Sequence, residues 1–166
     1  MSRKIIVLSA LISWMTGCAA KPAPEKPGAT FPLEFPVLLV SDRNLEVYDD
    51  EDSLTTTTTA SSMGYTEYQV IASDGMTYSI LKETQFGRPA WFTDMGTKPF
   101  RVFLEMKKRG VITLPKAKAL VLHTALAPHG PVDGAAHGAE IARQRIQGCQ
   151  SLPGLIEVCR KTWEWR

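Results

Sequence analysis

The sequence lacks the short motifs by which many enzymes and nucleotide-binding proteins are recognised. It contains neither a G-x-G-x-x-G nor a Walker-type loop for phosphate groups, and no G-x-S-x-G turn that would expose a nucleophilic serine. Carboxylates are numerous and scattered, so spacing alone singles out no acid–base pair. These absences favour a protein that is not an enzyme, and they give no reason to expect a cofactor.

Metal-binding residues are also scarce. The three histidines are His123, His129 and His137, and their spacing matches no helical H-x-x-x-H pair and no other zinc-ligand run. Proline and glycine around His129 predict a loop, in which histidines are commonly exposed. We therefore expect no metal site, with zinc binding by this region as the alternative.

A large excess of one charge is missing as well. The formal net charge of the chain is +2, too small for the basic footprint of a nucleic-acid-binding protein. Acidic residues nevertheless gather between Asp42 and Asp52, and basic clusters follow between Lys107 and Lys161. Such runs are usually solvated surfaces. A charged interface that selects a protein partner is the alternative.

The longest apolar run lies near the N-terminus. Residues 5–15 are mainly apolar and follow the basic residues Arg3 and Lys4. The run is too short to cross a bilayer, which takes about 20 residues. Its length and position are typical of the apolar region of a signal peptide, and the small residues Thr16 and Gly17 then lead to Cys18.

The stretch Met15-Thr16-Gly17-Cys18 resembles the lipobox of bacterial lipoproteins. The resemblance implies that residues 1–17 are a signal peptide. It also implies that Cys18 becomes the first mature residue, with a diacylglyceryl thioether and an acyl chain such as palmitate on its amino group. Ala19 stands where an aspartate would favour retention at the inner membrane. We therefore expect an outer-membrane anchor with the domain facing the periplasm; anchoring at the inner membrane or the cell surface is the alternative.

The remainder of the chain divides into a tether and one domain. Residues 18–30 are rich in proline and have no large apolar side chain, so they predict an extended tether of about 3.1 Å per residue. Residues 31–166 are long enough for a single globular domain with its own core. Removal of residues 1–17 also removes Arg3 and Lys4, which leaves the mature chain formally neutral.

Strand patterns dominate the first half of the domain. Residues 36–40 predict a buried strand and residues 45–48 a half-exposed one. The runs 67–73 and 76–83 flank Asp74-Gly75, a strong hairpin signal because glycine accepts a positive φ. Residues 100–107 predict a further strand, with a short one at 110–114. This half therefore predicts a small, mainly antiparallel sheet.

Helix patterns dominate the second half. Helices are expected over residues 115–126, 134–147 and 153–163, and the last of these has Leu155, Ile156, Cys159 and Trp163 on one apolar stripe. Strands followed by helices predict an α+β domain whose helices pack on one face of the sheet.

The acidic residues 49–52 predict the start of another helix, because carboxylates cap and stabilise helix N-termini. Residues 54–63, with Gly64 after them, fit such a helix, although the five threonines at 55–59 are poor helix formers. A calcium site is the alternative for the acidic residues, but no loop of alternating ligands with a distal glutamate follows.

Cys149 and Cys159 favour a disulfide, since an exported chain meets an oxidising compartment. On one straight helix they would lie about 15 Å apart, so Pro153 and Gly154 must break the chain between them. A reactive or metal-binding pair is the alternative, but the C-x-x-C spacing is lacking.

Trp91 and Phe92 lie in a loop-like stretch between two prolines and are candidate anchors for a protein partner. Packing at the end of the core is the alternative.

A second resemblance concerns the body of the chain. The run from Leu45 to Thr58, leading into Gly64-Tyr65, looks like stretches in small bacterial proteins of unassigned function, and it carries no site residues across. The leading hypothesis is a lipid-anchored envelope protein that binds another protein without catalysis, as an immunity or inhibitor lipoprotein or an envelope accessory factor. The alternative is a periplasmic hydrolase acting on cell-wall or lipid material.

Overall fold

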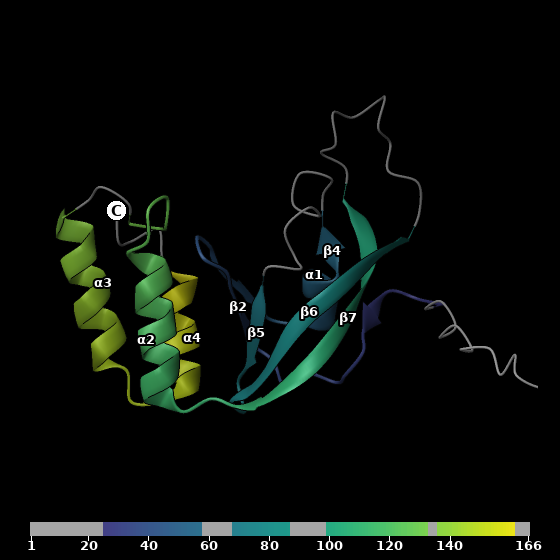
Figure 1. Ribbon diagram of the computed structural model, residues 1–166, viewed down its shortest axis with the longest axis horizontal. Coiled ribbons are helices and arrows are strands. Elements are labelled where there is room, and N and C mark those ends of the chain that lie inside the picture. Colours follow the sequence, from purple (N-terminus) through teal and green to yellow (C-terminus); the bar gives the residue numbers. More distant parts are fainter. Residues whose placement is uncertain (1–24, 58–67, 87–98, 133–135, 162–166) are drawn as a thin grey trace, which may run out of the picture.

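The computed structural model describes residues 25–57, 68–86, 99–132 and 136–161, and it confirms the predicted α+β class (Figure 1). Within these ranges seven strands form one sheet: β1 (Gly28–Ala29), β2 (Val37–Val40), β3 (Leu45–Tyr48), β4 (Thr56–Thr57), β5 (Gln69–Ala72), β6 (Met76–Phe86) and β7 (Phe100–Val111). The helices are α1 (Glu51–Leu54), α2 (Leu114–Ala125), α3 (Ala136–Gly148) and α4 (Leu152–Arg160).

The sheet is mostly antiparallel, in the order β1-β7-β6-β5-β2-β3. The predicted turn at Asp74-Gly75 joins β5 to β6, and Gly75 has the positive φ of 86° that the turn requires. Strands β6 and β7 form the longest pair, and they extend away from the three C-terminal helices (Figure 1). The two predicted segments 100–107 and 110–114 are largely one strand, β7, in which Gly110 has a φ of 127°.

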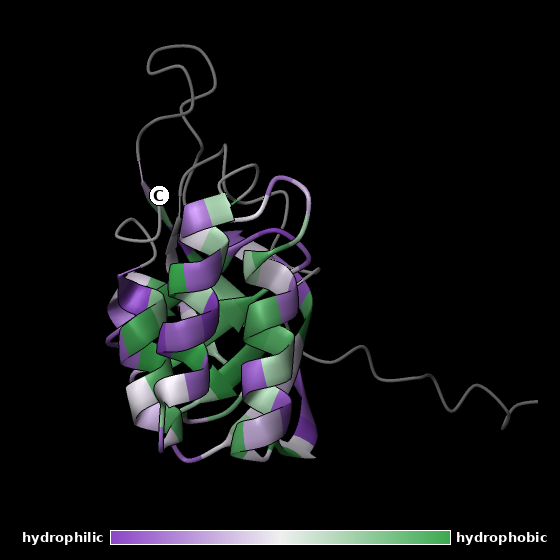
Figure 2. Ribbon diagram, turned by 90° about the vertical axis from the view of Figure 1, so that its left-hand side faces the viewer, coloured by the Kyte–Doolittle hydropathy of each residue, from purple (hydrophilic) through white to green (hydrophobic). Residues whose placement is uncertain are grey.

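Helices α2 and α4 pack on one face of β2 and β3, and α3 packs against α2 and α4. Apolar strand residues lie directly behind the helical layer (Figure 2). The helix–sheet core includes the buried residues Leu38, Val121, Ile146 and Ile156. The predicted apolar stripe of α4 is confirmed for Leu155, Ile156 and Cys159, all at most 2% exposed, and Trp163 lies outside the described residues.

A second core lies on the other face of the sheet, and the sheet curves around this core. Helix α1 contacts both β1 and β3, which are opposite edges of the strand order. Its Leu54 is fully buried beside Val70, Val102 and Leu104. Phe31, which precedes β2, covers this core, with its ring centroid 5.6 Å from that of Tyr78.

The prediction of a helix over residues 54–63 is wrong for the first residues of this segment. Helix α1 ends at Leu54, and Thr56–Thr57 form strand β4, which pairs with β7. β-Branched threonine favours the extended backbone, and Val102 N donates a hydrogen bond to the Thr55 carbonyl at 2.8 Å. Pairing with β7 therefore ends the helix after one turn. Residues 58–63 lie outside the described ranges.

The end of the expected tether belongs to the sheet. Residues 28–29 are strand β1, which pairs in parallel with β7 at Phe103 and Leu104. Ala29 N donates to Glu51 Oε1 at 3.0 Å, and Thr30 N donates to the Leu104 carbonyl at 3.1 Å. The pairing with β7 depends on backbone groups about 75 residues away, so local side-chain patterns gave no sign of it. The first strand of the sheet therefore lies within the segment that was expected to be tether.

The acidic residues 49–52 hold three elements together. Asp50 caps α1, as predicted, by accepting a hydrogen bond from Ser53 N at 2.7 Å. Asp49 receives two bonds of 2.6 Å from Arg160 of α4, and the Arg160 guanidinium keeps the pKa of this carboxyl below its ordinary value. Asp52 pairs with Arg101 of β7. These residues act as structural links.

Candidate functional site

An open groove of about 920 Å³ lies between the β2–β3 turn and helix α2. We call it the α2 groove. Its walls come from three segments, which are the turn, the outer face of α2 and the loop that follows α2. The lining residues are Asp42, Arg43, Ala119, Leu122, His123, Leu126, Ala127, Pro128 and His129.

The turn wall is fixed by Ser41. Its Oγ accepts hydrogen bonds from Asn44 N at 3.1 Å and Arg43 N at 3.3 Å, and its N–H donates to the Asn44 carbonyl at 3.0 Å. A serine side chain that bonds nearby backbone amides is a common way of holding a tight turn. The buried Thr124 of α2 donates to the Ser41 carbonyl at 2.8 Å. The turn and α2 are therefore joined directly.

The loop wall is held by backbone hydrogen bonds to the end of α2. Gly130 N donates to the Ala127 carbonyl at 2.9 Å, and Val132 N donates to the Ala125 carbonyl at 3.3 Å. A Cβ at Gly130 would lie 2.4 Å from the Thr124 carbonyl oxygen, so only glycine fits this position. His129, next to it, has a φ of 65°, a left-handed conformation in which histidine is more common than most residues.

The floor of the groove is a second apolar stripe on α2. Ala119, Leu122 and Leu126 recur at helical spacing on a side of α2 separate from the buried residues Ala117 and Val121. Both leucines are partly buried and also touch the helix–sheet core. Four ionisable side chains, Asp42, Arg43, His123 and His129, surround this apolar floor.

A preformed apolar groove with a polar rim is suited to binding rather than to bond cleavage. Apolar floors of this kind receive an anchoring side chain of a partner, and polar rims set its orientation. From the sequence, His123 and His129 were expected to be exposed, with zinc binding as the alternative, and the groove was not foreseen. The sequence feature that could have revealed the groove is the second apolar stripe of α2. A helix that packs on the core with one side needs only one such stripe.

The structure separates the three histidines. His123 is exposed on α2, His129 is exposed in the following loop, and His137 is exposed in the first turn of α3. Among the described residues, no three His, Cys, Asp or Glu side chains come together in a way that could hold a metal ion.

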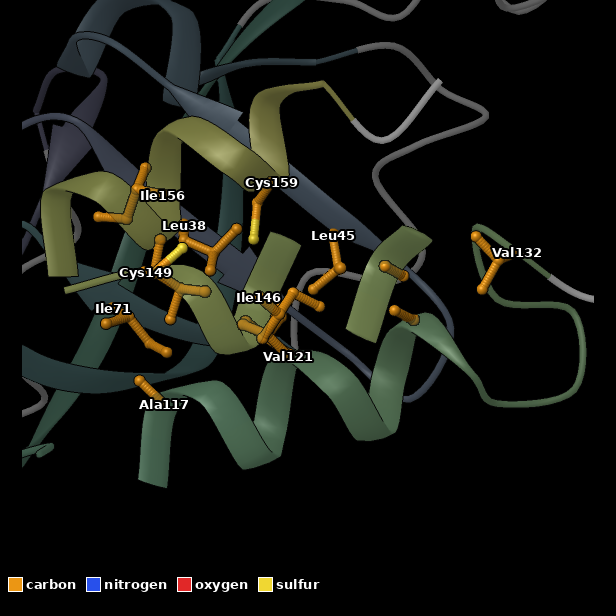
Figure 3. Close-up of a cluster of buried hydrophobic side chains, with 14 residues drawn as sticks. Leu38, Leu45, Ile71, Ala117, Val121, Val132, Ile146, Cys149, Ile156 and Cys159 are labelled. Atoms are coloured by element: carbon orange, nitrogen blue, oxygen red, sulfur yellow. The ribbon is translucent and has the colours of Figure 1, made fainter. Parts of the chain in front are cut away.

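Cys149 and Cys159 both lie in the helix–sheet core (Figure 3). Cys149 follows α3 and Cys159 lies in the last turn of α4, so the chain makes the predicted helical hairpin. Both are free thiols in the structure, and the disulfide stays a prediction. Burial raises the pKa of Cys149, and burial and the neighbouring Cys149 raise the pKa of Cys159 to about 12. Neither is therefore a reactive thiolate at neutral pH.

The remaining predicted site residues lie outside the described ranges. They are Cys18, the proposed lipidation site, and the candidate partner anchors Trp91 and Phe92. Their roles stay predictions.

Glu83 is a buried carboxylate that local sequence patterns did not single out. It lies opposite Leu104 in the β6–β7 ladder, so it shares the face of the second core. Both carboxylate oxygens are closed off from solvent and accept no hydrogen bond. Burial raises the pKa of this carboxyl. A register shift at residues 80–82 precedes it, and such shifts are difficult to foresee from alternation.

None of the described helices is both long and apolar enough to cross a bilayer. Comparisons of the chain with protein-family models, with curated proteins and with solved structures found no match.

Proposed function

We propose that this chain is a lipid-anchored protein of the bacterial envelope that binds another protein without catalysis. Its anchor is the acylated Cys18, and its domain faces the periplasm from the outer membrane. An immunity or inhibitor protein, or an accessory factor of an envelope assembly, has these properties. The lipobox-like residues 15–18 support the location, and the α2 groove supports the binding activity.

The groove carries this proposal because its walls are already in place in the unbound chain. The bond from Thr124 to Ser41 and the backbone bonds of the 126–132 loop fix its shape. A preformed surface loses little conformational entropy on binding, and this favours affinity for a given area. A stable complex would cover about 800 Å² on each partner. Leu122 and Leu126 would then lie at the centre, with the ionisable rim around them.

The lipid anchor is tested by mass spectrometry of protein purified from the envelope fraction. The expected N-terminal residue is Cys18 with three acyl chains, and Cys18→Ser should release the domain into the soluble periplasmic fraction. An unmodified N-terminus in the membrane-bound protein would contradict this part of the proposal.

The binding role is tested by affinity purification from envelope extracts with two matched variants. Ala119→Arg places a long side chain in the groove at an exposed helical position, where it has little effect on folding. Gln144→Arg introduces the same side chain at an exposed position of α3, outside the groove. The wild type and Gln144→Arg should recover a stoichiometric partner, and Ala119→Arg should lose it.

Two results would argue against the proposal in different ways. Equal recovery by both variants would place the binding surface elsewhere on the domain. Failure of the wild type to recover any partner, with the domain folded, would remove the basis for a binding function.

A further inference from the structure

The sheet has a face that the helices leave uncovered. Ile71 of β5 faces the helix–sheet core, and it pairs with Thr77 of β6. Directly opposite residues share a face, and so do residues two apart on one strand. The same face therefore continues through Ser79 to Lys107, its partner on β7. Helices α2 and α4 pack on β2 and β3, α3 packs on those two helices, and none of the three lies over this part (Figure 1).

This uncovered face is basic. Lys107 and Arg109 are exposed on either side of Ser79, and Arg109 Nε donates to Ser79 Oγ at 2.8 Å. Lys82 is exposed on β6, and Glu105, opposite Lys82, is the carboxylate of this face. Lys108 is exposed too, but it lies opposite Tyr78 and so shares the other face. We call Lys82, Lys107 and Arg109 the hairpin cations.

The hairpin cations differ from three basic residues of α3 and the end of α4. Arg143 pairs with Glu140, both Arg160 and Lys161 pair with Glu157, and Arg160 also pairs with Asp49. Among the described residues, no carboxylate forms an ion pair with a hairpin cation. Leu81, next to Lys82, is 52% exposed. The face therefore combines unpaired positive charge with an exposed leucine.

The N-terminal chain reaches the domain on the side of the hairpin. Strand β1 pairs with β7 at Phe103 and Leu104, and residues 25–27, which precede it, lie on the side away from the helices (Figure 1). Cys18 precedes Gly28 by ten residues. Even a fully extended polyproline-type tether would then keep β1 within about 31 Å of an anchored residue 18.

From these observations we infer that the uncovered face of the β6–β7 hairpin docks on an anionic phospholipid surface. The hairpin cations attract the lipid phosphates, and Leu81 enters the interfacial region. The orientation rests on the proposed anchor at Cys18, whereas the charge complementarity does not.

The test is co-sedimentation with vesicles, with residues 18–166 carrying Cys18→Ser so that acyl chains are absent. Vesicles of phosphatidylcholine with 30% phosphatidylglycerol, chosen as roughly a third anionic lipid, are compared with pure phosphatidylcholine in about 50 mM salt. We expect binding to the anionic vesicles only, and loss of binding in about 0.5 M salt, which screens the charges. Neutralising two hairpin cations in Lys107→Gln/Arg109→Gln should weaken the binding about 30-fold.

The matched control is Arg143→Gln/Arg145→Gln, which removes the same charge from exposed positions of α3 and should weaken binding by less than about 3-fold. Absence of binding to anionic vesicles, equal binding to neutral vesicles or equal loss in both double variants would overturn the inference. So would loss of a protein partner in Lys107→Gln/Arg109→Gln without vesicle binding, because the cations would then serve an acidic protein. The assay uses neither the acyl anchor nor a partner, so its failure leaves the groove experiment unaffected.

Discussion

The helical half of this protein and the β6–β7 hairpin differ in how many of their charges are paired, although Arg101 of β7 does pair with Asp52. In the helical half, Arg160 joins α4 to the acidic turn through Asp49, and Lys118 of α2 donates to the Gln147 carbonyl of α3. In the hairpin, Lys107 and Lys108 have no carboxylate partner among the described residues, and the carboxylate of Glu83 is buried without a hydrogen bond. The hairpin therefore keeps charged groups that contribute little to its own stability.

The difference indicates how the two halves are used. Charges that link elements are part of the fold, because removing them loosens packing between helices and strands. Unpaired charges on a long, partly uncovered hairpin are better explained by something outside the domain. We therefore expect the stability of the domain to be concentrated in the helical half.

The largest expected effect is in the helix–sheet core. Ile156→Ala should destabilise the domain by about 2–5 kcal/mol, because it removes a side chain that is only 1% exposed and leaves a cavity. Leu81→Ala on the uncovered face should change the free energy of unfolding by less than about 0.5 kcal/mol. Urea unfolding followed by circular dichroism measures both. Similar losses in the two variants would remove the contrast between the halves.

The next effect concerns Cys149 and Cys159. Oxidation by a disulfide such as oxidised glutathione should join them, with loss of two hydrogens from the protein and reduction of the glutathione. The bridge should add about 2–4 kcal/mol to the free energy of unfolding. Intact-mass measurement and urea unfolding with and without reductant check this, and the Cys149→Ser/Cys159→Ser variant is the control. A chain that keeps both thiols under oxidising conditions would leave the structural bridge without support.

The smallest effect is on the hairpin side, at Glu83. The raised pKa of this carboxyl means that the folded state binds its proton more readily than the unfolded state does. The free energy of unfolding should therefore fall as pH rises from the unfolded-state pKa through the raised folded-state pKa. Glu83→Gln removes the buried charge and should stabilise the domain by about 1 kcal/mol at pH 7.

The control for Glu83 is Glu34→Gln, the same chemical change at an exposed position before β2. Urea unfolding at pH 4 and pH 7 separates the two variants, because the gain from Glu83→Gln should shrink at the lower pH. A gain that does not depend on pH would show that Glu83 is not the titrating group.

Local sequence patterns were enough to predict most of the helices and strands. The alternation of residues 45–48, the Asp74-Gly75 turn and the apolar stripe of α4 each depend on neighbours a few residues apart, and each is confirmed. Strand β1 and the early end of α1 were missed because long-range backbone hydrogen bonds to β7 decide them. The α2 groove was missed because its walls come from segments about 80 residues apart.

The sequence by itself determined the α+β class, the order of strands and helices and the cap at Asp50, because these follow from periodicity and from chemistry within one or two turns. Only the tertiary structure decided which charges find partners. Asp49 meets Arg160 across 111 residues, whereas Lys107 faces outward on a surface that no helix covers. Whether two charged side chains pair depends on the distance between them in the folded chain, and local sequence patterns do not contain that distance.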